Sequence, residues 1–443
     1  MKPETGGGLH TRPVELLQRL LRFDTTNPPG NEKTCIDFIR QTLAGYGIES
    51  ALYSKDPNRP NLVARLIGTG AAPPLLLYGH VDVVTTANQD WTHPPFAGEI
   101  VDGWVWGRGA LDMKSGVAMM LAAFLRARAE GAELPGDVIF LALSDEEAGA
   151  EFGAQFMVEE RPEVFDGVRH AISEFGGFSL ALGNARFYPI MVAEKVIASL
   201  RLTVRGPGGH GSLPMRGGTM ARAAQVLRIL DENRLPAHLT SATAAMLRGM
   251  ADGLSGDAGA SMQGLLNEST IDATLDSMAE SGQIYDPLLH NTVNATIIRG
   301  GSKFNVIPSE VTIDLDGRML PGFGPEDIVR ELGDLLGDLA EIEVLAHDPP
   351  GRGEPDLGLF PTLVDVLKEA DPAGLPVPLI MYGATDGRFF EMLGIQTYGF
   401  LPMDLPGDFD FSHLLHAADE RIPASALEFG TDAIFQVLTR FGD

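Results

Sequence analysis

The spacing of apolar residues predicts an α/β chain in its first part. Residues 13–23 and 32–46 carry apolar side chains at helical spacing, and so do residues 117–125. Short apolar runs at 75–78 and 138–143 are typical of strands buried in a sheet. Buried strands that alternate with helices indicate an open α/β sheet with helices packed against it.

The pattern changes from about residue 194 and returns to α/β alternation after residue 350. The predicted elements between these points are strands at 196–204, 292–299, 309–318 and 341–346 and helices at 219–232 and 325–338. Their order, β-α-β-β-α-β, is that of a ferredoxin-like domain. Residues 236–290 have no clear period, and we interpret them as a helical elaboration. We therefore expect one domain from residues 1–193 and 351–443, with a small α+β domain, residues 194–350, inserted into it.

A histidine and several acidic residues stand where predicted strands end. His80 and Asp82 follow the first buried run, and because side chains alternate along an extended chain, the two point to the same side. The acidic run 145–147 and Glu174 directly follow two later strands. Open α/β sheets form ligand sites beyond the carboxyl ends of their strands, so a site is expected here.

Each of these residues also has a simpler interpretation. A histidine beside an aspartate is common in surface turns, and three acids in a row usually form a solvated turn. Asp112 directly precedes a predicted helix, where aspartate is a frequent N-cap. An N-cap carboxylate at a strand-to-helix junction can also face a ligand, so the two roles are compatible. His170 begins its strand and is interpreted as structural.

Two histidines and three carboxylates together suit two zinc-like ions that share one carboxylate. These candidate ligands are His80, Asp112, Glu147, Glu174 and His416. Glu146 remains as a general base, and Asp82 as the group that orients His80. His413 competes with His416 for the last ligand position. The Asp-Glu pair three residues after His416 favours His416.

Composition and charge limit the kinds of binding partner and metal ligand that the protein can use. The net charge is −27, from 33 basic and 60 acidic residues, which argues against nucleic acid or an anionic membrane surface as the main partner. Cys35 is the only cysteine, so a metal site must use histidines and carboxylates. No stretch approaches the roughly 18 apolar residues of a membrane span. A cytoplasmic protein that acts on a small molecule is expected.

In their order along the chain, the motifs resemble those of the dinuclear-zinc amidohydrolases and exopeptidases. This family includes acetylornithine deacetylase, succinyl-diaminopimelate desuccinylase, aminoacylase-1, glutamate carboxypeptidase and carboxypeptidase S. The resemblance covers almost the whole chain and is carried by residues 79–84, 107–114, 145–147, 206–212, 305–308, 385–388 and 416–420.

The resemblance implies a role for each candidate ligand. One zinc ion would be held by His80 and Glu174, and the other by Glu147 and His416. Asp112 would bridge the two ions, and cobalt or manganese could substitute for zinc. The resemblance also implies a cis peptide bond after Asp112.

The resemblance further implies that Glu146 removes a proton from the water shared by the two ions and then protonates the leaving amine. The inserted domain, residues 194–350, would serve as a lid and form a homodimer. Its His210 would reach the active site of the partner subunit and stabilise the oxyanion there.

Four residues are candidates for binding the substrate: Asn305, Arg318, Arg388 and Gly383. Either arginine could hold a substrate carboxylate through two hydrogen bonds. The alternative is that each arginine pairs with the acidic residue two positions before it. Phe175 follows Glu174 where relatives often carry proline or glycine, so the pocket wall is expected to differ here.

The sequence therefore predicts a metal-dependent hydrolase that cleaves the amide bond of an N-acyl amino acid or short peptide. One alternative is a non-catalytic relative that only binds a small molecule, and another is a biosynthetic deacylase. A relative that had lost activity would be expected to lack the base or a ligand first. All of these residues are present.

Overall fold

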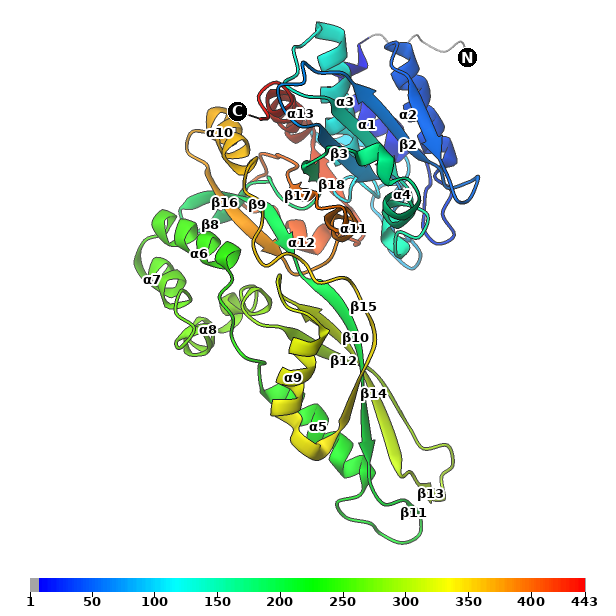
Figure 1. Cartoon of the computed structure of the whole chain (residues 1–443), viewed down its shortest axis with the longest axis vertical. Coiled ribbons are helices and arrows are strands. Elements are labelled where there is room, and N and C mark those ends of the chain that lie inside the picture. The colour runs from blue at the N-terminus through cyan, green and yellow to red at the C-terminus, as the bar shows by residue number, and fades with distance from the viewer. Residues whose placement is uncertain (1–7, 443) are drawn as a thin grey trace. The chain divides into compact units, whose positions relative to one another are not determined.

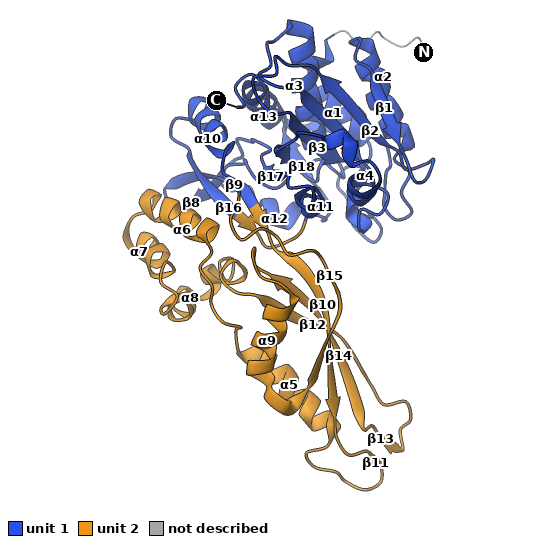
Figure 2. Cartoon of the chain, viewed as in Figure 1, with its two compact units in different colours: residues 1–192, 356–379, 385–443 blue, residues 193–355, 380–384 orange. Residues whose placement is uncertain are grey.

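The structure is a computed structural model that describes residues 8–442. The chain divides into two compact units, coloured separately in Figure 2. The first unit comprises the residues up to 192, residues 356–379 and the residues from 385 onward. The second comprises residues 193–355 and 380–384.

A nine-stranded sheet is the centre of the first unit (Figure 1). Its main path runs β1-β2-β6-β3-β7-β17-β9-β16, and β8 pairs with β9. The strands are β1 (Ser50–Tyr53), β2 (Asn61–Leu66), β3 (Leu75–His80), β6 (Val138–Leu143), β7 (His170–Ser173), β8 (Leu180–Leu182), β9 (Ala185–Glu194), β16 (Leu375–Met381) and β17 (Gln396–Gly399). Strand β3 pairs in parallel with β6 on one side and β7 on the other, so their carboxyl ends meet at one edge.

Helices cover the sheet because its central strands are apolar on both faces. All residues of β3 and β6 are buried. Helix α3 (Lys114–Glu130) packs against β3 and is itself covered by α1 (Pro13–Leu21) and α13 (Ala424–Leu438). The first twelve residues of α3 are all buried, as expected for a helix with apolar residues on every side over 117–125. Helices α2 (Lys33–Gly45), α4 (Ala154–Glu160), α10 (Phe360–Ala370) and α11 (Gly387–Met392) complete the unit, whose α/β class the sequence predicted.

The second unit contains an antiparallel sheet in the order β12-β14-β10-β15. Its strands are β10 (Val196–Arg205), β12 (Thr292–Gly300), β14 (Glu310–Met319) and β15 (Glu341–His347). Helices α5 (Thr219–Glu232) and α9 (Pro325–Leu336) pack on this sheet, and buried positions alternate along β10 and β14. The predicted ferredoxin-like order is confirmed.

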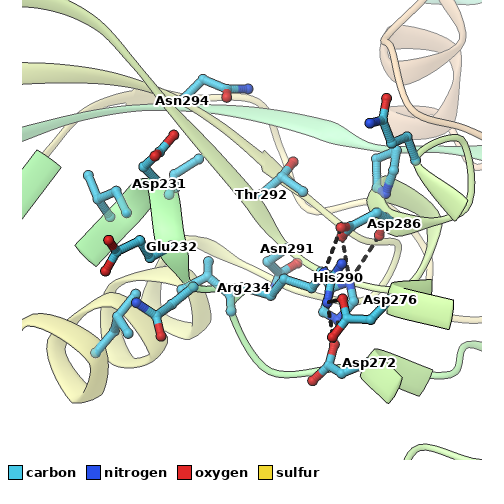
Figure 3. Close-up of a pocket in the computed structure, with 17 residues that line it drawn as sticks. Asp231, Glu232, Arg234, Asp272, Asp276, Asp286, His290, Asn291, Thr292 and Asn294 are labelled. Atoms are coloured by element: carbon cyan, nitrogen blue, oxygen red, sulfur yellow. Dashed lines mark hydrogen bonds and ion pairs between the residues drawn. The ribbon is translucent and has the colours of Figure 1, made fainter. Parts of the chain in front are cut away.

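The segment 236–290 forms helices α6 (Ser241–Gly253), α7 (Gly256–Gly264) and α8 (Ile271–Met278). Lys195 ties the end of this segment to the start of β10, because its ammonium donates to the carbonyl oxygens of Pro287 and His290. Figure 3 shows His290 with a carboxylate on either side. Its Nδ1 lies 2.9 Å from Asp286 Oδ1 and its Nε2 lies 3.1 Å from Asp272 Oδ1.

Some elements are absent from the sequence prediction. Strand β9 was not predicted, nor was a small sheet of β4 (Glu99–Val101), β5 (Trp104–Trp106) and β18 (Arg421–Pro423). The second unit also carries a two-stranded ribbon of β11 (Gly209–His210) and β13 (Val306–Ile307). Among the residues that the structure describes, no helix is both long and apolar enough to cross a membrane.

Candidate dinuclear metal site

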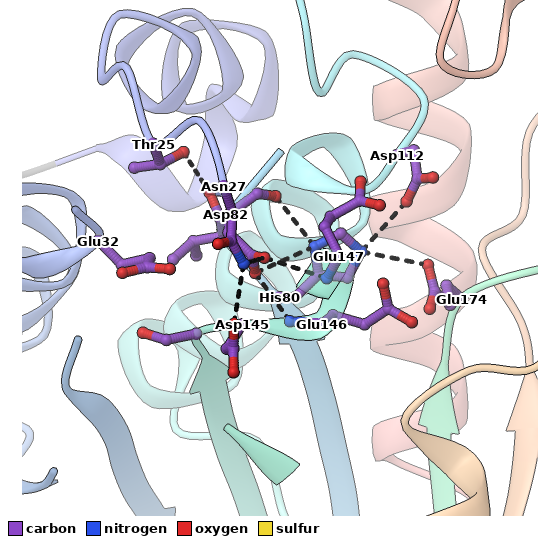
Figure 4. Close-up of polar contacts among 12 residues, drawn as sticks. Thr25, Asn27, Glu32, His80, Asp82, Asp112, Asp145, Glu146, Glu147 and Glu174 are labelled. Atoms are coloured by element: carbon purple, nitrogen blue, oxygen red, sulfur yellow. Dashed lines mark hydrogen bonds and ion pairs between the residues drawn. The ribbon is translucent and has the colours of Figure 1, made fainter. Parts of the chain in front are cut away.

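Three neighbouring parallel strands deliver most of the predicted site residues to one edge of the sheet. Strand β3 ends at His80. The turn after β6 carries Glu146 and Glu147, and Glu174 directly follows β7. Figure 4 shows these side chains gathered around His80, with Asp112 beside them.

Asp112 lies between the two histidines. His80 Nε2 is 3.1 Å from Asp112 Oδ1 and 3.5 Å from Glu174 Oε2. His416 Nε2 is 3.1 Å from the other oxygen, Asp112 Oδ2, and 3.4 Å from Glu147 Oε2. Each carboxylate oxygen of Asp112 therefore faces a different histidine, which is the arrangement of a carboxylate that bridges two cations.

The chemistry of these groups fits two divalent cations. The ligand atoms of His80, Asp112 and Glu174 lie within 4.8 Å of one another, and so do those of Asp112, Glu147 and His416. Glu147 Oε1 is buried and has no hydrogen-bond partner in the described part of the chain. Imidazole nitrogens and carboxylate oxygens are the ligands that zinc and similar ions accept when no thiolate is available.

The hydrogen bond on the far side of the His80 ring fixes which nitrogen can bind a cation. His80 Nδ1 lies 3.0 Å from the main-chain carbonyl oxygen of Asp82. Because a carbonyl oxygen only accepts, Nδ1 carries a proton, and Nε2 is the nitrogen that would offer its lone pair to a cation held beside Asp112 and Glu174.

The carboxylate of Asp82 makes different contacts from those predicted. It lies 3.6 Å from His80 Nδ1, which is too long for a hydrogen bond, because the main-chain carbonyl reaches the ring first. Its oxygens instead accept the backbone N–H groups of Glu146, at 3.2 Å, and Glu147, at 3.1 Å. Asp82 therefore orients His80 through its backbone and holds the acidic turn through its side chain.

A buried polar network that the sequence analysis missed extends from Asp82 (Figure 4). The side-chain amide of Asn27 donates to Asp82, at 2.8 Å, and to Asp145, at 2.9 Å. Asp145 also pairs with Arg59, at 2.9 Å, and Arg59 binds both carboxylate oxygens of Glu32. Every one of these side chains is buried.

Glu420 fixes the loop that carries Asp112. Its buried carboxylate accepts the backbone N–H groups of Gly109, Leu111 and Asp112, and it pairs with Arg108 at 2.6 Å. The peptide bond after Asp112 is cis, which confirms what the resemblance implies. 

The same buried arginine connects this loop to the second histidine of the cluster. Arg108 also donates to the carbonyl oxygen of His416. His413, the competing candidate, is exposed and pairs with Asp410 instead.

Several acids in this cluster are buried close together, and their pKa values reflect it. Burial raises the pKa of Glu146 well above its usual range and raises the pKa of Glu174 to about 7. Burial favours a raised pKa for Asp112 too, but hydrogen bonds from His416 and His80 outweigh it and lower that pKa. Hydrogen bonds to Asp112 and Glu147 raise the pKa of His416 to about 10. Bound cations would relieve the repulsion among these carboxylates.

Asp386 is a further buried acid close to the cluster. Burial raises its pKa to about 7, and the charges of His80 and Glu174 act on it. Its Oδ1 has no hydrogen-bond partner among the described residues. The sequence analysis considered Asp386 only as an ion-pair partner of Arg388, so its place beside the metal ligands was missed.

The remaining predicted residues do not belong to the ligand cluster. Arg388 lies in the first turn of α11, where it donates to the carbonyl oxygen of Thr385 and its guanidinium lies over the ring of Phe389. Four others belong to the second unit: His210, Asn305, Arg318 and Gly383. Arg318 binds both carboxylate oxygens of Asp316, at 2.8 and 3.1 Å, as the alternative interpretation held.

Two of these second-unit residues are exposed neighbours. His210 on β11 pairs with β13, and the backbone N–H of Gly211 donates to the carbonyl oxygen of Asn305 at 2.9 Å. His210 Nδ1 lies 2.7 Å from the hydroxyl of Ser212.

Residues 76–440 match the sequence model of peptidase family M20/M25/M40. The chain belongs to this family. It is a metal-dependent hydrolase of peptide or amide bonds, as the motifs predicted.

Named relatives cover different parts of the chain. A probable carboxypeptidase S-like 2 of Dictyostelium discoideum is 28% identical over 375 residues, 79% of this chain and 68% of that protein. The human N-fatty-acyl-amino acid synthase/hydrolase PM20D1 is 28% identical over 379 residues, 82% of this chain and 73% of that protein. A succinyl-diaminopimelate desuccinylase of Methylorubrum populi is 37% identical over 213 residues, 46% of this chain and 52% of that protein.

The fold is also found in solved structures. The M20 family metallo-carboxypeptidase Sso-CP2 of Sulfolobus solfataricus superposes with a TM-score of 0.68 at 16% identity, over 96% of this chain and 98% of that one. This similarity confirms the predicted fold class.

Proposed function

We propose that this chain hydrolyses N-acyl amino acids or short peptides that carry a free carboxylate next to the scissile amide. The observation that carries the proposal is Asp112, whose two oxygens face His80 and His416 with an acidic residue beside each histidine. The names of two relatives support the proposal, since one is a probable carboxypeptidase S-like protein and the other an N-fatty-acyl-amino acid synthase/hydrolase.

Two zinc ions are the proposed cofactors, with cobalt or manganese as substitutes. His80 and Glu174 would hold one ion, Glu147 and His416 the other, and Asp112 would bridge them. When bound, such a pair supplies Lewis-acid activation of the water and of the amide carbonyl.

Glu146 is the proposed general base. Its backbone is held by Asp82, and its half-buried side chain stands beside the ligand groups. It would take the proton from the attacking water and pass it to the leaving nitrogen. Burial raises its pKa, which suits a carboxylate that must hold a proton between these two steps.

Arg318 and Arg388 are the proposed sites for the substrate carboxylate, with Asn305 and Gly383 as further contacts. The guanidinium of Arg318 already binds both carboxylate oxygens of Asp316, a geometry that a substrate carboxylate could also adopt. A substrate carboxylate would compete with Asp316 for it.

The second unit is proposed to act as a lid and to form a homodimer. Strand β12 is an edge of its sheet and is largely exposed, including Ile297 and Ile298. An exposed apolar edge is a surface on which another strand pairs, and a twofold axis would pair β12 with its own copy. His210 is proposed to act in the active site of the partner subunit.

A biosynthetic deacylase of the desuccinylase type is the second candidate, because the Methylorubrum populi enzyme matches about half of the chain. A cytoplasmic location stays a prediction.

The metal-loaded protein can be tested with an N-acyl amino acid and its C-terminal amide. We expect the acid to be cleaved and the amide to be a poor substrate. Replacing the arginine that grips the carboxylate, by Arg318→Ala or Arg388→Ala, should remove about 1.5–3 kcal/mol of binding for the acid alone. Arg65→Ala is the matched control, because Arg65 lies in a surface ion pair with Asp137. Equal cleavage of acid and amide by the wild type would contradict the proposed carboxylate requirement.

A further inference from the structure

A small cavity borders two of the metal-ligand carboxylates. Asp112 and Glu174 form one side of it, and the rest of its lining is apolar apart from a glycine backbone. The cavity measures about 10 Å³, close to the space that one water molecule needs. All of its lining residues belong to the first unit.

Three aromatic rings form the partly exposed wall of this cavity. Phe178 stacks on Phe411 with ring centres 4.3 Å apart and an interplanar angle of 10°. Phe175 meets Phe411 edge-on, at 6.1 Å and 84°. Phe175 directly follows Glu174, while Phe411 opens α12 (Phe411–Leu414), shortly before His416. The wall therefore joins the segments that carry two of the ligands.

The backbone of Phe175 adopts a conformation that a bulky residue rarely takes. Its φ angle is 69°, in the left-handed region that glycine enters at little cost. Such strain persists where the surroundings hold the residue, and it is concentrated at functional sites. The chain uses a phenylalanine at this position and places its ring against Phe411.

The place of Glu146 suggests which part of the amide this cavity can serve, an inference that rests on the proposed function. The leaving nitrogen must approach Glu146 to receive its proton, and Glu146 is not among the lining residues. The apolar space beside Asp112 and Glu174 is therefore assigned to the substituent on the carbonyl carbon.

The lining also limits the kind of acyl group. It contains no basic side chain, and its only charged members are carboxylates. A second carboxylate at the end of the acyl chain, as in a succinyl group, would lie among apolar side chains and lose hydration without a basic side chain to pair with. The small volume admits little more than a methyl group unless Phe175 or Phe411 moves.

We propose that this cavity is the acyl-binding pocket and that it selects short, uncharged, apolar acyl groups. Phe175 and Phe411 set its length limit. The chain is then a deacylase of acetyl-like substrates and not a desuccinylase.

The test compares acetyl, butanoyl, octanoyl and succinyl derivatives of one amino acid with the metal-loaded protein. We expect kcat/KM for the acetyl derivative to exceed that for the succinyl derivative at least about tenfold, since discrimination in an apolar pocket starts at this level. Phe175→Gly removes the ring and suits the backbone angle, and Phe411→Ala opens the same wall. Each should raise the octanoyl-to-acetyl ratio about tenfold or more.

Phe409→Ala is the matched control. Phe409 lies two residues before Phe411 and stacks on Trp104, outside the cavity lining. Its acyl preference should equal that of the wild type. Metal content is measured for every variant. If Phe411→Ala does not fold, the acyl preference of Phe175→Gly alone decides the result.

Any of three results would overturn the pocket assignment while leaving the proposed function intact. These are succinyl cleavage as fast as acetyl cleavage by the wild type, an unchanged acyl preference in Phe175→Gly, or a Phe175→Gly variant that changes its preference for the amino acid instead of the acyl group. If the metal-loaded wild type cleaves none of these derivatives or the matching dipeptides, the proposed function fails, and this inference fails with it.

Discussion

Asp82 lies at the centre of the hydrogen bonds that connect the proposed base to the rest of the site. Its backbone carbonyl orients His80, and its carboxylate accepts the N–H groups of Glu146 and Glu147. The side-chain amide of Asn27 donates to the same carboxylate. Small shifts of Asp82 would therefore move a metal ligand and the base together.

The first residue-scale prediction concerns Glu146. Glu146→Gln should retain both metal ions, because the five proposed ligands are untouched. Its kcat should fall about 100-fold or more, the usual worth of a general base. Metal analysis and steady-state kinetics check the two parts separately. Full activity, or loss of metal, would contradict the role given to Glu146.

The second residue-scale prediction concerns Arg59, which pairs with Glu32 and Asp145 behind the acidic turn. Arg59→Lys keeps the charge but loses the two-pronged contact with Glu32. We expect kcat to fall about tenfold, with KM and metal content unchanged. This is the usual effect of changing a residue that orients metal ligands without contacting the metal.

Arg65→Lys serves as the control for this prediction, because Arg65 also forms an ion pair but at the surface. It should leave kcat unchanged. If Arg59→Lys changed only the thermal stability and not kcat, Arg59 would be structural and the positioning role would be wrong.

Sequence patterns place a side chain where a strand end fixes it, and they miss contacts between distant segments. His80 and Glu174 stand at the carboxyl ends of buried strands, which the apolar runs of the sequence mark. Asn27 meets Asp145 across 118 positions of sequence, and no local pattern reports such a contact. The alternation of side chains along a strand predicted the side to which Asp82 points. It did not predict that the main-chain carbonyl of Asp82, and not its carboxylate, would bind the His80 ring.

At the scale of elements, strands with a clear apolar pattern were predictable and short or irregular ones were not. Strand β6 is a run of six buried apolar residues, and β10 alternates along its length. Strands β4, β5 and β18 have three residues each, which is too short for a period. Strand β9 contains Pro189, which argues against a strand in the sequence.

The prediction at this scale concerns the end of the helical segment 236–290. Burial opposes a charged His290, but its hydrogen bonds to Asp286 outweigh burial and raise its pKa. A raised pKa in the folded protein stabilises it fully below the unfolded value of about 6.5. This stabilisation is lost as the pH rises through the folded pKa. Asp272 and Arg234 adjoin the same cluster.

His290→Gln should therefore lower the free energy of unfolding most at acidic pH, by about 1.5–3 kcal/mol for hydrogen bonds to a charged group. The difference from the wild type should shrink as the pH rises from 6 to 9. Urea unfolding of the metal-loaded wild type and variant at several pH values measures this difference in free energy. Other titrating groups are the same in both proteins, so their effects cancel in the difference. A difference that does not depend on pH would mean that His290 is neutral in the folded protein.

At the scale of the whole molecule, the proposed site residues are divided between the two units. The cluster consists of acids and two histidines of the first unit, whereas the exposed His210 belongs to the second. The apolar edge strand β12 belongs to the second unit as well. In the proposed homodimer, each subunit would supply its His210 to the other, from a ribbon of two short strands.

The last prediction tests this exchange by mixing two inactive proteins. His210→Ala lacks the proposed oxyanion group, and Glu146→Ala lacks the base. After subunit exchange, a mixed dimer has one site with both groups, because the Glu146 of one chain meets the His210 of the other. Equal mixing makes half of the dimers mixed, so we expect about a quarter of wild-type activity when twofold pairing is random.

The control mixes Glu146→Ala with Asp112→Asn. Both changes lie in the first unit, so neither site of a mixed dimer is complete and activity should not return. Native mass spectrometry of isotope-labelled subunits verifies the exchange. If exchange is complete and the His210→Ala mixture stays inactive, His210 acts within its own chain or has no part in catalysis. If the protein is a monomer at micromolar concentration, the role proposed for β12 is wrong as well.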